Sequence, residues 1–355
     1  MMGPDPVPGA LRERRAAAVP RSTRRGRALT AAAAITGALA VTGFYSPPRA
    51  VPGAPIRMLL ARDAAGLNVA AIAPDAFGAS GGVNVRFALP NDTVSYPVQQ
   101  ARGSAPLAYQ WVRFDNQAVA AGAPRAIAGP TLVAPSEPGF YQLALVSGDV
   151  RRVIDAPTLA VKVPFARKLG AVLNGYRIGT YLAERLGADH DRPDGFVEVA
   201  AHQVDLPLSK HFRLGDFLTR DAQEHWPRYA AVSPRLLDKL ELVLAEIARV
   251  NGRDPEVSVS VEVNSGYRTP LHNRSVGLAA NDSRHQYGDA ADVKVDANFD
   301  GRFTATDARL VALAAEMVER RHPELAGGIG LYTSRRYSTP YVHIDARGTR
   351  ARWRS

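Results

Sequence analysis

Two segments of the sequence carry histidine and aspartate at spacings that suit metal binding. In "SRHQYGDAADV", His285 lies seven positions before Asp292. In "YVHIDA", His343 and Asp345 fall on one face of a predicted strand, because side chains alternate along a strand. Two histidines and a carboxylate from separate segments provide three ligands, the number that a catalytic zinc ion takes when its fourth position holds water.

Three of the residues between the two candidate ligands of the first segment are small. Gly288 permits a turn between His285 and Asp292, and Ala290 and Ala291 leave room for an ion. Each segment alone also has a structural alternative, either a histidine that caps a turn or a histidine–aspartate pair inside a buried hydrogen-bond network. On spacing alone, both alternatives stay open.

The composition limits the chemistry that the chain can perform. Its 355 residues are 46% hydrophobic and 22% charged, which is typical of a globular protein of about two domains. It contains no cysteine, so thiolate metal sites and cysteine nucleophiles are excluded, and a metal must take nitrogen and oxygen ligands. Half of the net charge of +10 comes from the arginine-rich residues 1–27, so no basic stripe indicates nucleic-acid binding.

Residues 1–50 are typical of an export signal. The arginines are followed by the apolar run "ALTAAAAITGALAVTGFY", and Ala38-Leu39-Ala40 offers a small-residue cleavage site. The run is intermediate in length between a signal-peptide core and a minimal membrane span, so cleavage and retention as a membrane anchor both stay open. We expect the rest of the chain to work outside the cytoplasm, in the periplasm, in the cell envelope or as a secreted protein.

Residues 51–164 predict an all-β, immunoglobulin-like sandwich domain. Short apolar segments such as "VNVRFALP" and "GFYQLALVSG" alternate with turn residues. They hold no catalytic cluster, so we interpret this domain as a spacer or docking module whose partner is unknown. A connecting segment, residues 165–204, leads into the next domain.

Residues 205–355 predict an α+β domain. A helix begins after the N-cap Ser233, with Pro234 in its first turn, and ends at Gly252. A second helix is predicted from about Thr306 to Arg321. Its apolar face is predicted at Leu310, Leu313, Ala314 and Met317. Strand patterns in "VSVSVEVNS", "AADVKV" and "YVHIDA" lie between and after these helices.

Four motifs of this domain occur in a recognisable order: "SGYRTPLHN", "SRHQYGDAAD", "GGIGLY" and "YVHIDARG". The set resembles the zinc D-Ala-D-Ala carboxypeptidase and murein endopeptidase family, which has a hedgehog-like metallopeptidase fold. It is most similar to the branch whose final metal motif is a His-x-Asp strand near the C-terminus. The resemblance covers about residues 205–350. It implies a zinc ion held by His285, Asp292 and His343, with a peptide of peptidoglycan as substrate.

The resemblance also implies roles for two further residues and exposes one departure. Ser283 and Arg268 match positions that contact the substrate in relatives, and the planar fork of Arg268 suits a carboxylate or a polarised carbonyl. A structural salt bridge is the alternative for Arg268. Many relatives carry an acid three positions before the last ligand, where this chain has Pro340.

The departure at Pro340 leaves the general base open. Zinc would polarise the scissile carbonyl and lower the pKa of a bound water, but a carboxylate must still move the proton to the leaving amine. Asp345 is the first candidate because it shares a strand face with His343. Its alternative role is to orient that histidine, since ligating histidines usually donate to a carboxylate or carbonyl.

The remaining histidines and glycines give weaker signals. We expect packed or exposed side chains rather than metal ligands at His211, His225, His272 and His322, although His272 could approach the site. The glycines of "GGIGLY" do not form a dinucleotide-binding fingerprint. We expect them to let the backbone pass close to the cleft.

The segment "DANFDGRFTATD" predicts a second metal site, for calcium. It resembles the calcium loops of dockerin modules, with a glycine at its sixth position for a sharp turn. The predicted ligands are Asp296, Asn298, Asp300, the Arg302 carbonyl, Thr304 and Asp307. The alternative is a polar turn in which Asp307 only caps the following helix.

Three functions follow from the sequence. The first is zinc-dependent hydrolysis of peptide bonds in peptidoglycan stem peptides or cross-links. The second is a catalytically inactive protein that keeps the peptidase fold and binds cell wall, an alternative that the missing acid at Pro340 leaves open. The third is a structural protein of the envelope organised by the sandwich domain.

Overall fold

The computed structural model describes residues 69–72, 77–96, 98–100, 106–120, 122–187, 190–277, 279–334 and 339–355. The predicted export signal and the start of the predicted sandwich therefore lie outside the described residues. Contacts within the chain separate residues 1–49 from residues 50–355, and all described residues belong to the second unit. In the described part of the chain, no helix is long and apolar enough to cross a membrane.

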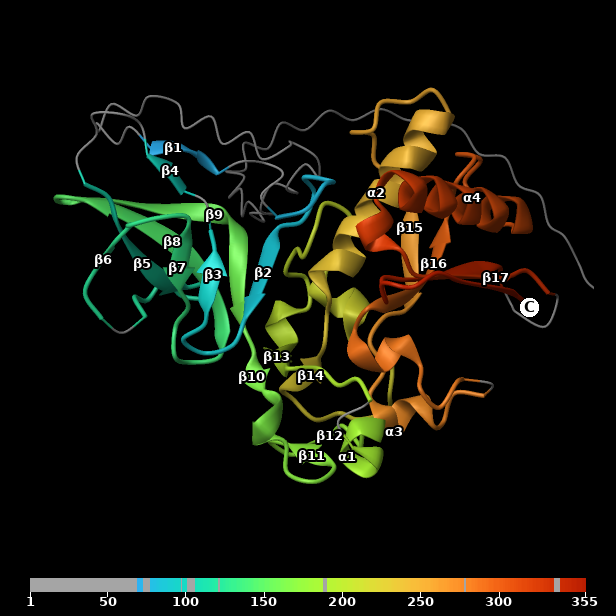
Figure 1. The fold of residues 1–355 in the computed structure, drawn as a ribbon, viewed down its shortest axis with the longest axis horizontal. Coiled ribbons are helices and arrows are strands. Elements are labelled where there is room, and N and C mark those ends of the chain that lie inside the picture. Colours follow the sequence, from blue (N-terminus) through green and yellow to red (C-terminus); the bar gives the residue numbers. More distant parts are fainter. Residues whose placement is uncertain are drawn as a thin grey trace, which may run out of the picture. The chain divides into compact units, whose positions relative to one another are not determined.

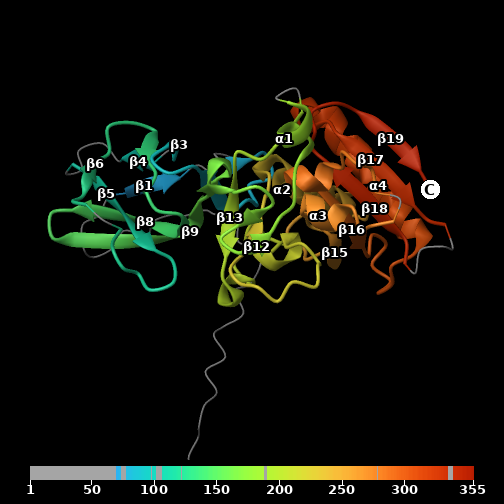
Figure 2. The same cartoon turned by 90° about the horizontal axis from the view of Figure 1, so that it is seen from below.

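The sheet that carries the candidate ligands has five strands in the order β15-β16-β18-β17-β19 (Figures 1 and 2). Neighbouring strands are antiparallel except for β17 and β19, which are parallel. Their bounds are β15 Val261–Ser265, β16 Ala290–Val295, β17 Gly328–Tyr332, β18 Tyr341–Asp345 and β19 Ala351–Arg354. The predicted strands in "AADVKV" and "YVHIDA" are confirmed.

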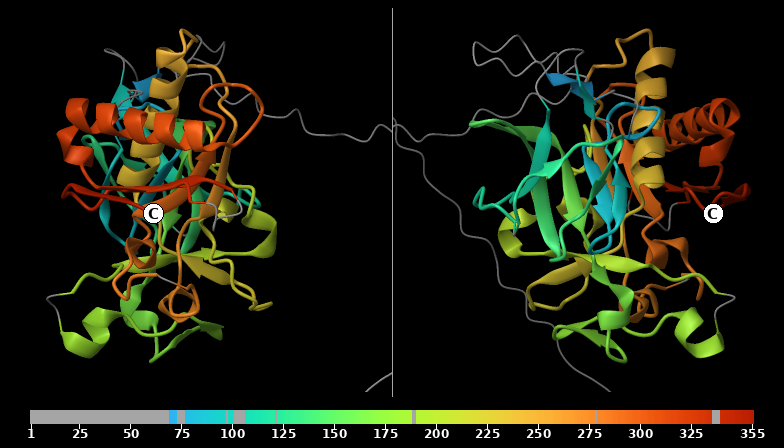
Figure 3. Two further views of the ribbon diagram at one scale, coloured as in Figure 1. Left: turned by 90° about the vertical axis from the view of Figure 1, so that its right-hand side faces the viewer. Right: turned by 60° about the vertical axis from the view of Figure 1, so that its left-hand side comes forward.

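Helices α2 (Pro234–Val250) and α4 (Ala305–Arg321) pack together, and α4 crosses one face of this sheet over β16, β17 and β18 (Figure 3). Alternation along β18 sends Val342 and Ile344 into the core, where both are fully buried. His343 and Asp345 therefore lie on the opposite face. The sheet thus has one face that builds the core and one that carries the polar cluster.

The predicted start of α2 is confirmed, with Ser233 as N-cap and Pro234 in the first turn, and Asn251 caps its other end one residue before Gly252. The predicted apolar face of α4 is confirmed at Ala314, which is buried, and at Leu310, which packs against the core, but it is wrong at Leu313, which is 55% exposed. The buried residues of α4 include Ala308, Val311, Ala314, Ala315 and Val318. Small and β-branched side chains let this helix approach the sheet closely, whereas the leucine pattern pointed to a neighbouring stripe.

Lys239 of α2 fastens the end of β18. Its side chain is fully buried, and its Nζ donates to the Asp345 carbonyl at 2.6 Å and to Glu319 of α4 at 2.7 Å. A buried charge is tolerated only when it is paired and hydrogen-bonded, as here. The ammonium group of Lys239 therefore joins the two helices to the strand that carries His343, in addition to apolar packing.

Several short elements lie between residues 163 and 273 of the chain. A three-stranded sheet joins β10 (Val163–Pro164), β13 (Gly195–Val199) and β14 (Arg228–Ala230), and a hairpin joins β11 (Val172–Leu173) to β12 (Tyr176–Arg177). Two short helices lie in the same part of the chain, α1 (Leu182–Leu186) and α3 (Pro270–Asn273).

The N-terminal described residues are rich in strands, as predicted. A five-stranded sheet has the order β2-β9-β8-β5-β6, in which β2 is parallel to β9. Its bounds are β2 Val85–Ala88, β5 Ala108–Arg113, β6 Arg125–Ala126, β8 Gly139–Ser147 and β9 Val150–Val161. Two-stranded ladders pair β3 (Thr93–Ser95) with β7 (Thr131–Val133) and β1 (Val69–Ile72) with β4 (Val98–Gln100). A separate immunoglobulin-like domain is not confirmed and stays a prediction.

Candidate metal centre

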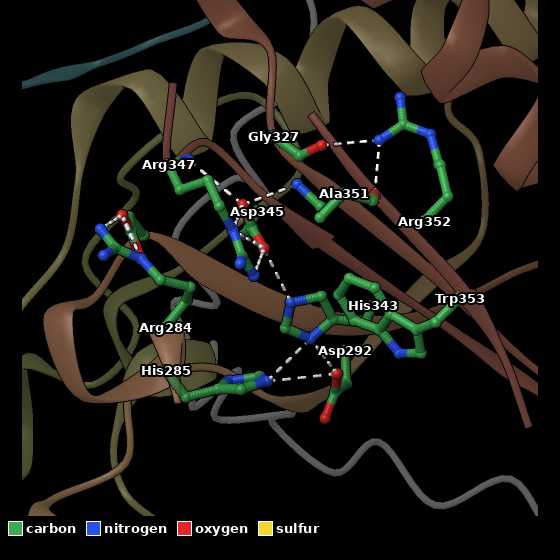
Figure 4. A network of polar contacts seen from close by, with 12 residues as sticks. Arg284, His285, Asp292, Gly327, His343, Asp345, Arg347, Ala351, Arg352 and Trp353 are labelled. Atoms are coloured by element: carbon green, nitrogen blue, oxygen red, sulfur yellow. Dashed lines mark hydrogen bonds and ion pairs between the residues drawn. The ribbon is translucent and has the colours of Figure 1, made fainter. Parts of the chain in front are cut away.

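Three of the predicted site residues converge on one point of the polar face of the sheet (Figure 4). Nε2 of His285 lies 3.2 Å from Oδ1 of Asp292 and 3.1 Å from Nδ1 of His343. Nδ1 of His343 lies 3.0 Å from the same oxygen of Asp292. Among the residues that the structure describes, this is the group of histidine and acidic ligand atoms able to hold a metal ion.

The fold brings these residues together from three places. Asp292 and His343 are direct partners across β16 and β18. His285 lies in a 3-10 turn, Arg284–Tyr287, that ends at Gly288 with a left-handed φ of 73°. A Cβ at Gly288 would lie 2.2 Å from the Ala231 carbonyl oxygen, so glycine is required there for space as well as for conformation.

In each of the two histidines, the ring nitrogen outside the cluster has a hydrogen-bond partner, and this partner fixes which nitrogen carries the proton. Nδ1 of His285 lies 2.7 Å from the Gly266 carbonyl, which can only accept, so this nitrogen donates and Nε2 keeps its lone pair. Nε2 of His343 lies 3.2 Å from the Asp345 carboxylate and donates in the same way, leaving the lone pair on Nδ1. Two lone pairs and a carboxylate oxygen therefore face one another.

This donor set fits zinc. Three ligands at zinc bond lengths of about 2.0–2.2 Å in tetrahedral directions lie roughly 3.3–3.6 Å apart, close to the separations found here. All three ligand residues are buried, and nitrogen and oxygen ligands of this kind are those that a chain without cysteine can offer. A cation would satisfy the converging lone pairs after side-chain shifts of about a few tenths of an ångström.

The electrostatics of the metal-free cluster point the same way. Burial opposes ionisation of Asp292, but the neighbouring His285 and His343 outweigh it and hold the pKa of this carboxyl well below its ordinary value. Burial lowers the pKa of His285. Burial would also lower the pKa of His343, but hydrogen bonds to Asp292 and Asp345 raise it above its ordinary value. The cluster therefore keeps an ionised Asp292 carboxylate beside a neutral His285 ring at pH 7.

Asp345 lies on the far side of His343 from the converging ligand atoms (Figure 4). Its fully buried carboxylate accepts the Gly328 backbone N–H at 2.7 Å and the Arg347 guanidinium at 2.5–3.0 Å. Burial opposes its ionisation, but the bonds from His343 and Arg347 hold its pKa well below the ordinary range. This geometry favours the orienting role over that of general base.

Arg268 and Ser283 lie beside the cluster. Arg268 donates to the second oxygen of Asp292 at 2.5 Å and to Oγ of Ser265 at 2.7 Å, so it orients a candidate ligand through a salt bridge. These contacts agree with the alternative role of Arg268, a structural salt bridge. Ser283 is buried at the N-cap of the turn that carries His285, and its side chain makes no capping hydrogen bond.

The sequence analysis missed Trp353, which stands next to the cluster. Its ring lies 5.1 Å from the ring of His343, and its Nε1 donates to the Tyr332 hydroxyl at 2.8 Å. The glycines of "GGIGLY" make room for these contacts, since a Cβ at Gly330 would lie 2.3 Å from Nε1 of Trp353. The glycines of this strand were the available signal, whereas Trp353 itself carries none.

The predicted calcium ligands form a loop that is braced by its own hydrogen bonds. Asp296 accepts the backbone N–H groups of Asp300 and Gly301, and Asp307 accepts those of Ala297 and Asn298. In the described chain, the acids of this loop do not form a group of converging ligand atoms. The contacts of the loop agree with the alternative, a polar turn in which Asp307 caps the following helix. Calcium binding is not supported.

Asp307 also takes part in a capping box at the start of α4. Thr304 is the N-cap, and its backbone N–H donates to the Asp307 carboxylate at 2.9 Å. The Arg302 backbone N–H donates to Asp300 at 2.9 Å, which closes the preceding turn. These bonds explain the spacing of the acids without an ion.

The four other histidines named above lie in separate surroundings. Nδ1 of His211 lies 2.7 Å from Glu241, and Nε2 of His225 lies 3.0 Å from the Asn174 carbonyl. His272 belongs to the short helix α3, and His322 lies 3.4 Å from Glu324.

Comparison with known families adds one finding. Residues 233–313 match the family model described as Peptidase M15. The match runs from the N-cap of α2 into α4 and includes His285 and Asp292, but it stops before His343. It supports the M15 zinc peptidase family in general and does not single out the D-Ala-D-Ala carboxypeptidase branch. No curated protein and no solved structure matched the chain.

Proposed function

We propose that this protein is a zinc-dependent peptidase that hydrolyses peptide bonds in peptidoglycan, either in stem peptides or in cross-links. The convergence of His285, Asp292 and His343 within 3.2 Å, with their lone pairs facing one another, carries the proposal. The Peptidase M15 match over two of these residues supports the same chemistry. The motif set around Arg268 and Ser283 supports a peptidoglycan peptide as substrate.

The chain's own residues would divide the work of the site. His285, Asp292 and His343 would hold the zinc ion, while Asp345 and Arg268 keep two of these ligands in position. The bound ion would polarise the scissile carbonyl and lower the pKa of a water molecule beside it. The guanidinium of Arg268 contacts Asp292 at the edge of the cluster, and its planar fork would suit a substrate carbonyl or carboxylate.

One observation favours a second function, the wall-binding protein without catalytic activity. Among the described residues, the carboxylates in contact with the ligand cluster are Asp292 and Asp345, and both are engaged by histidine and arginine. Pro340 stands where many relatives carry an acid. A site with metal but without a proton-transferring acid would bind its peptide and turn it over slowly.

We also propose that the protein is exported and works at the cell envelope, with residues 1–50 as signal or membrane anchor. The arginine-rich start and the following apolar run support this location. Peptidoglycan lies in the same compartment. Fusion of residues 1–50 to a reporter enzyme that is active only outside the cytoplasm would test export directly.

The decisive experiment incubates the full chain with soluble muropeptides, with zinc and with a chelator. Zinc-dependent release of a shortened stem peptide or of D-alanine supports the peptidase. Metal binding together with retention on sacculi, but without product, supports the wall-binding protein. A protein that takes up no metal would contradict both.

A further inference from the structure

The C-terminal strand β19 brings a tryptophan onto the metal-bearing face of the sheet. Trp353 is the parallel-register partner of Gly330, which in turn is the partner of His343. The three residues therefore lie in one row across β19, β17 and β18. Because the middle residue is glycine, the indole reaches over it, and its ring centre lies 5.1 Å from that of His343 with the planes inclined by 48°.

A closed set of contacts joins His343 to three side chains outside the ligand cluster (Figure 4). The Nε2–H of His343 donates to Asp345, and Asp345 accepts from the Arg347 guanidinium. That guanidinium lies over the indole of Trp353, 5.9 Å from its ring centre, and the indole contacts His343. Each member of this set, which we call the His343 clasp, limits the movement of the next.

The clasp is itself anchored in the sheet. Nε1 of Trp353 donates to the hydroxyl of Tyr332 at 2.8 Å, which fixes the rotation of the indole. The ring of Tyr332 stacks on that of Tyr341, with centres 4.5 Å apart and planes 9° from parallel. Tyr341 belongs to the same strand as His343, two residues earlier. The indole is therefore held from both β17 and β18.

We propose that Trp353 is a positioning residue of the metal centre: it fixes the ring plane of His343 so that Nδ1 stays aimed at the ion. The inference rests on the proposed zinc site. A ligating imidazole that can rotate loses affinity because its lone pair leaves the metal direction, and partners of ligands typically contribute 10- to 100-fold in affinity. Asp345 restrains one nitrogen of the ring, and the indole restrains the ring plane that a single hydrogen bond leaves free.

The test measures Co²⁺ binding to the purified full chain by chelator competition, together with the absorption spectrum of the Co²⁺ form. We expect Trp353→Ala to raise the Co²⁺ Kd by about 10-fold or more and to change the spectrum. Trp353→Phe keeps a ring beside His343 and should stay within about 3-fold of wild type, closer than the alanine variant. Arg354→Ala alters the neighbouring side chain of the same strand, on the opposite face, and is the matched control.

A double-mutant cycle keeps the proposal testable if Trp353→Ala does not fold. Tyr332→Phe removes the hydroxyl that receives the indole N–H and should weaken Co²⁺ binding by roughly 3-fold, without loss of the fold. Combined with Trp353→Phe, which removes the donor of the same bond, it should cost no more than the larger single effect. Unchanged Co²⁺ affinity and spectrum in Trp353→Ala, or fully additive losses in the cycle, would overturn the proposal.

These measurements separate this inference from the proposed peptidase activity. Co²⁺ binding requires no substrate, so the result stands whether or not muropeptides are cleaved. If cleavage occurs, Trp353→Ala should lower kcat more than it changes KM, because the residue acts through a ligand and not through the substrate. An increase in KM alone would assign Trp353 to the substrate and contradict the positioning role.

Discussion

His343 and Asp292 face each other directly across β18 and β16, and the Nδ1 of the one lies 3.0 Å from the Oδ1 of the other. The pair is buried, and strand register alone sets it. His285 reaches the same point from a turn outside the sheet. A rigid two-strand base with one ligand added from a loop is a sound design for a metal site, because positions on strands are more precise than positions on loops.

Removing a ligand should abolish metal binding. His343→Ala and His285→Ala each leave two of the three ligands, so we expect the zinc Kd to rise by more than about 100-fold, beyond the loss typical of an outer partner. Competition with a chromogenic chelator measures it. His225→Ala, which changes a histidine outside the cluster, is the control. Zinc binding at wild-type strength in either ligand variant would remove the site.

Asp345→Asn distinguishes the two roles of this residue. As an orienting partner of His343, the carboxylate should be worth about 10- to 100-fold in zinc affinity, and the variant should lose metal and activity together. As a general base, it should leave zinc affinity unchanged while turnover falls. The geometry predicts the first result, and zinc titration of the variant beside a muropeptide assay measures both quantities.

Zinc binding should weaken as the pH falls. Because the pKa of His343 is raised, protons begin to compete with zinc for its Nδ1 at a pH above the ordinary histidine pKa of 6.5. In the metal-free protein the sign is opposite: a raised histidine pKa contributes stability at low pH that is lost as the pH rises through it. The increase of Tm on adding zinc should therefore grow between about pH 5.5 and pH 8. An increase that is independent of pH would contradict this.

Gly330→Ala should disturb the packing of Trp353 beside the ligand cluster. The new Cβ would lie 2.3 Å from Nε1 of Trp353, so the indole must move, at a cost of about 1–3 kcal/mol in the free energy of unfolding. Urea denaturation measures it. Gly129→Ala, whose Cβ meets open space, should change stability by less than about 0.5 kcal/mol. Equal stabilities of the two variants would show that the close approach is relieved elsewhere.

The loop before α4 separates capping from calcium binding. Asp307→Ala removes the acceptor of the capping box and should cost about 0.5–2 kcal/mol, with or without calcium. If the loop also binds calcium, wild type should melt higher in its presence and Asp300→Ala should not. The hydrogen bonds predict no response to calcium from either protein, and thermal melting in calcium and in chelator decides it.

The sequence by itself determined the identity of the cluster and the strands that carry it. Alternation is a local property, so Val342 and Ile344 in the core imply His343 and Asp345 on the other face. The small residues around His285 likewise indicated a turn, and Gly288 adopts the left-handed conformation that such a turn needs. The helix α2 followed from its cap and its period for the same reason.

Only the tertiary structure decided how these residues share the work. Strand register, which is non-local, set Asp292 opposite His343. The path of the chain after β15 placed the guanidinium of Arg268 against Asp292. The tertiary structure also surrounded Asp345 with donors. Trp353 carries no local signal, because its contact with His343 depends on a parallel pairing of β19 with β17 across Gly330. The types of side chain in the site can be read from the sequence. Packing decides which nitrogen of His343 faces the other ligands and which faces a carboxylate.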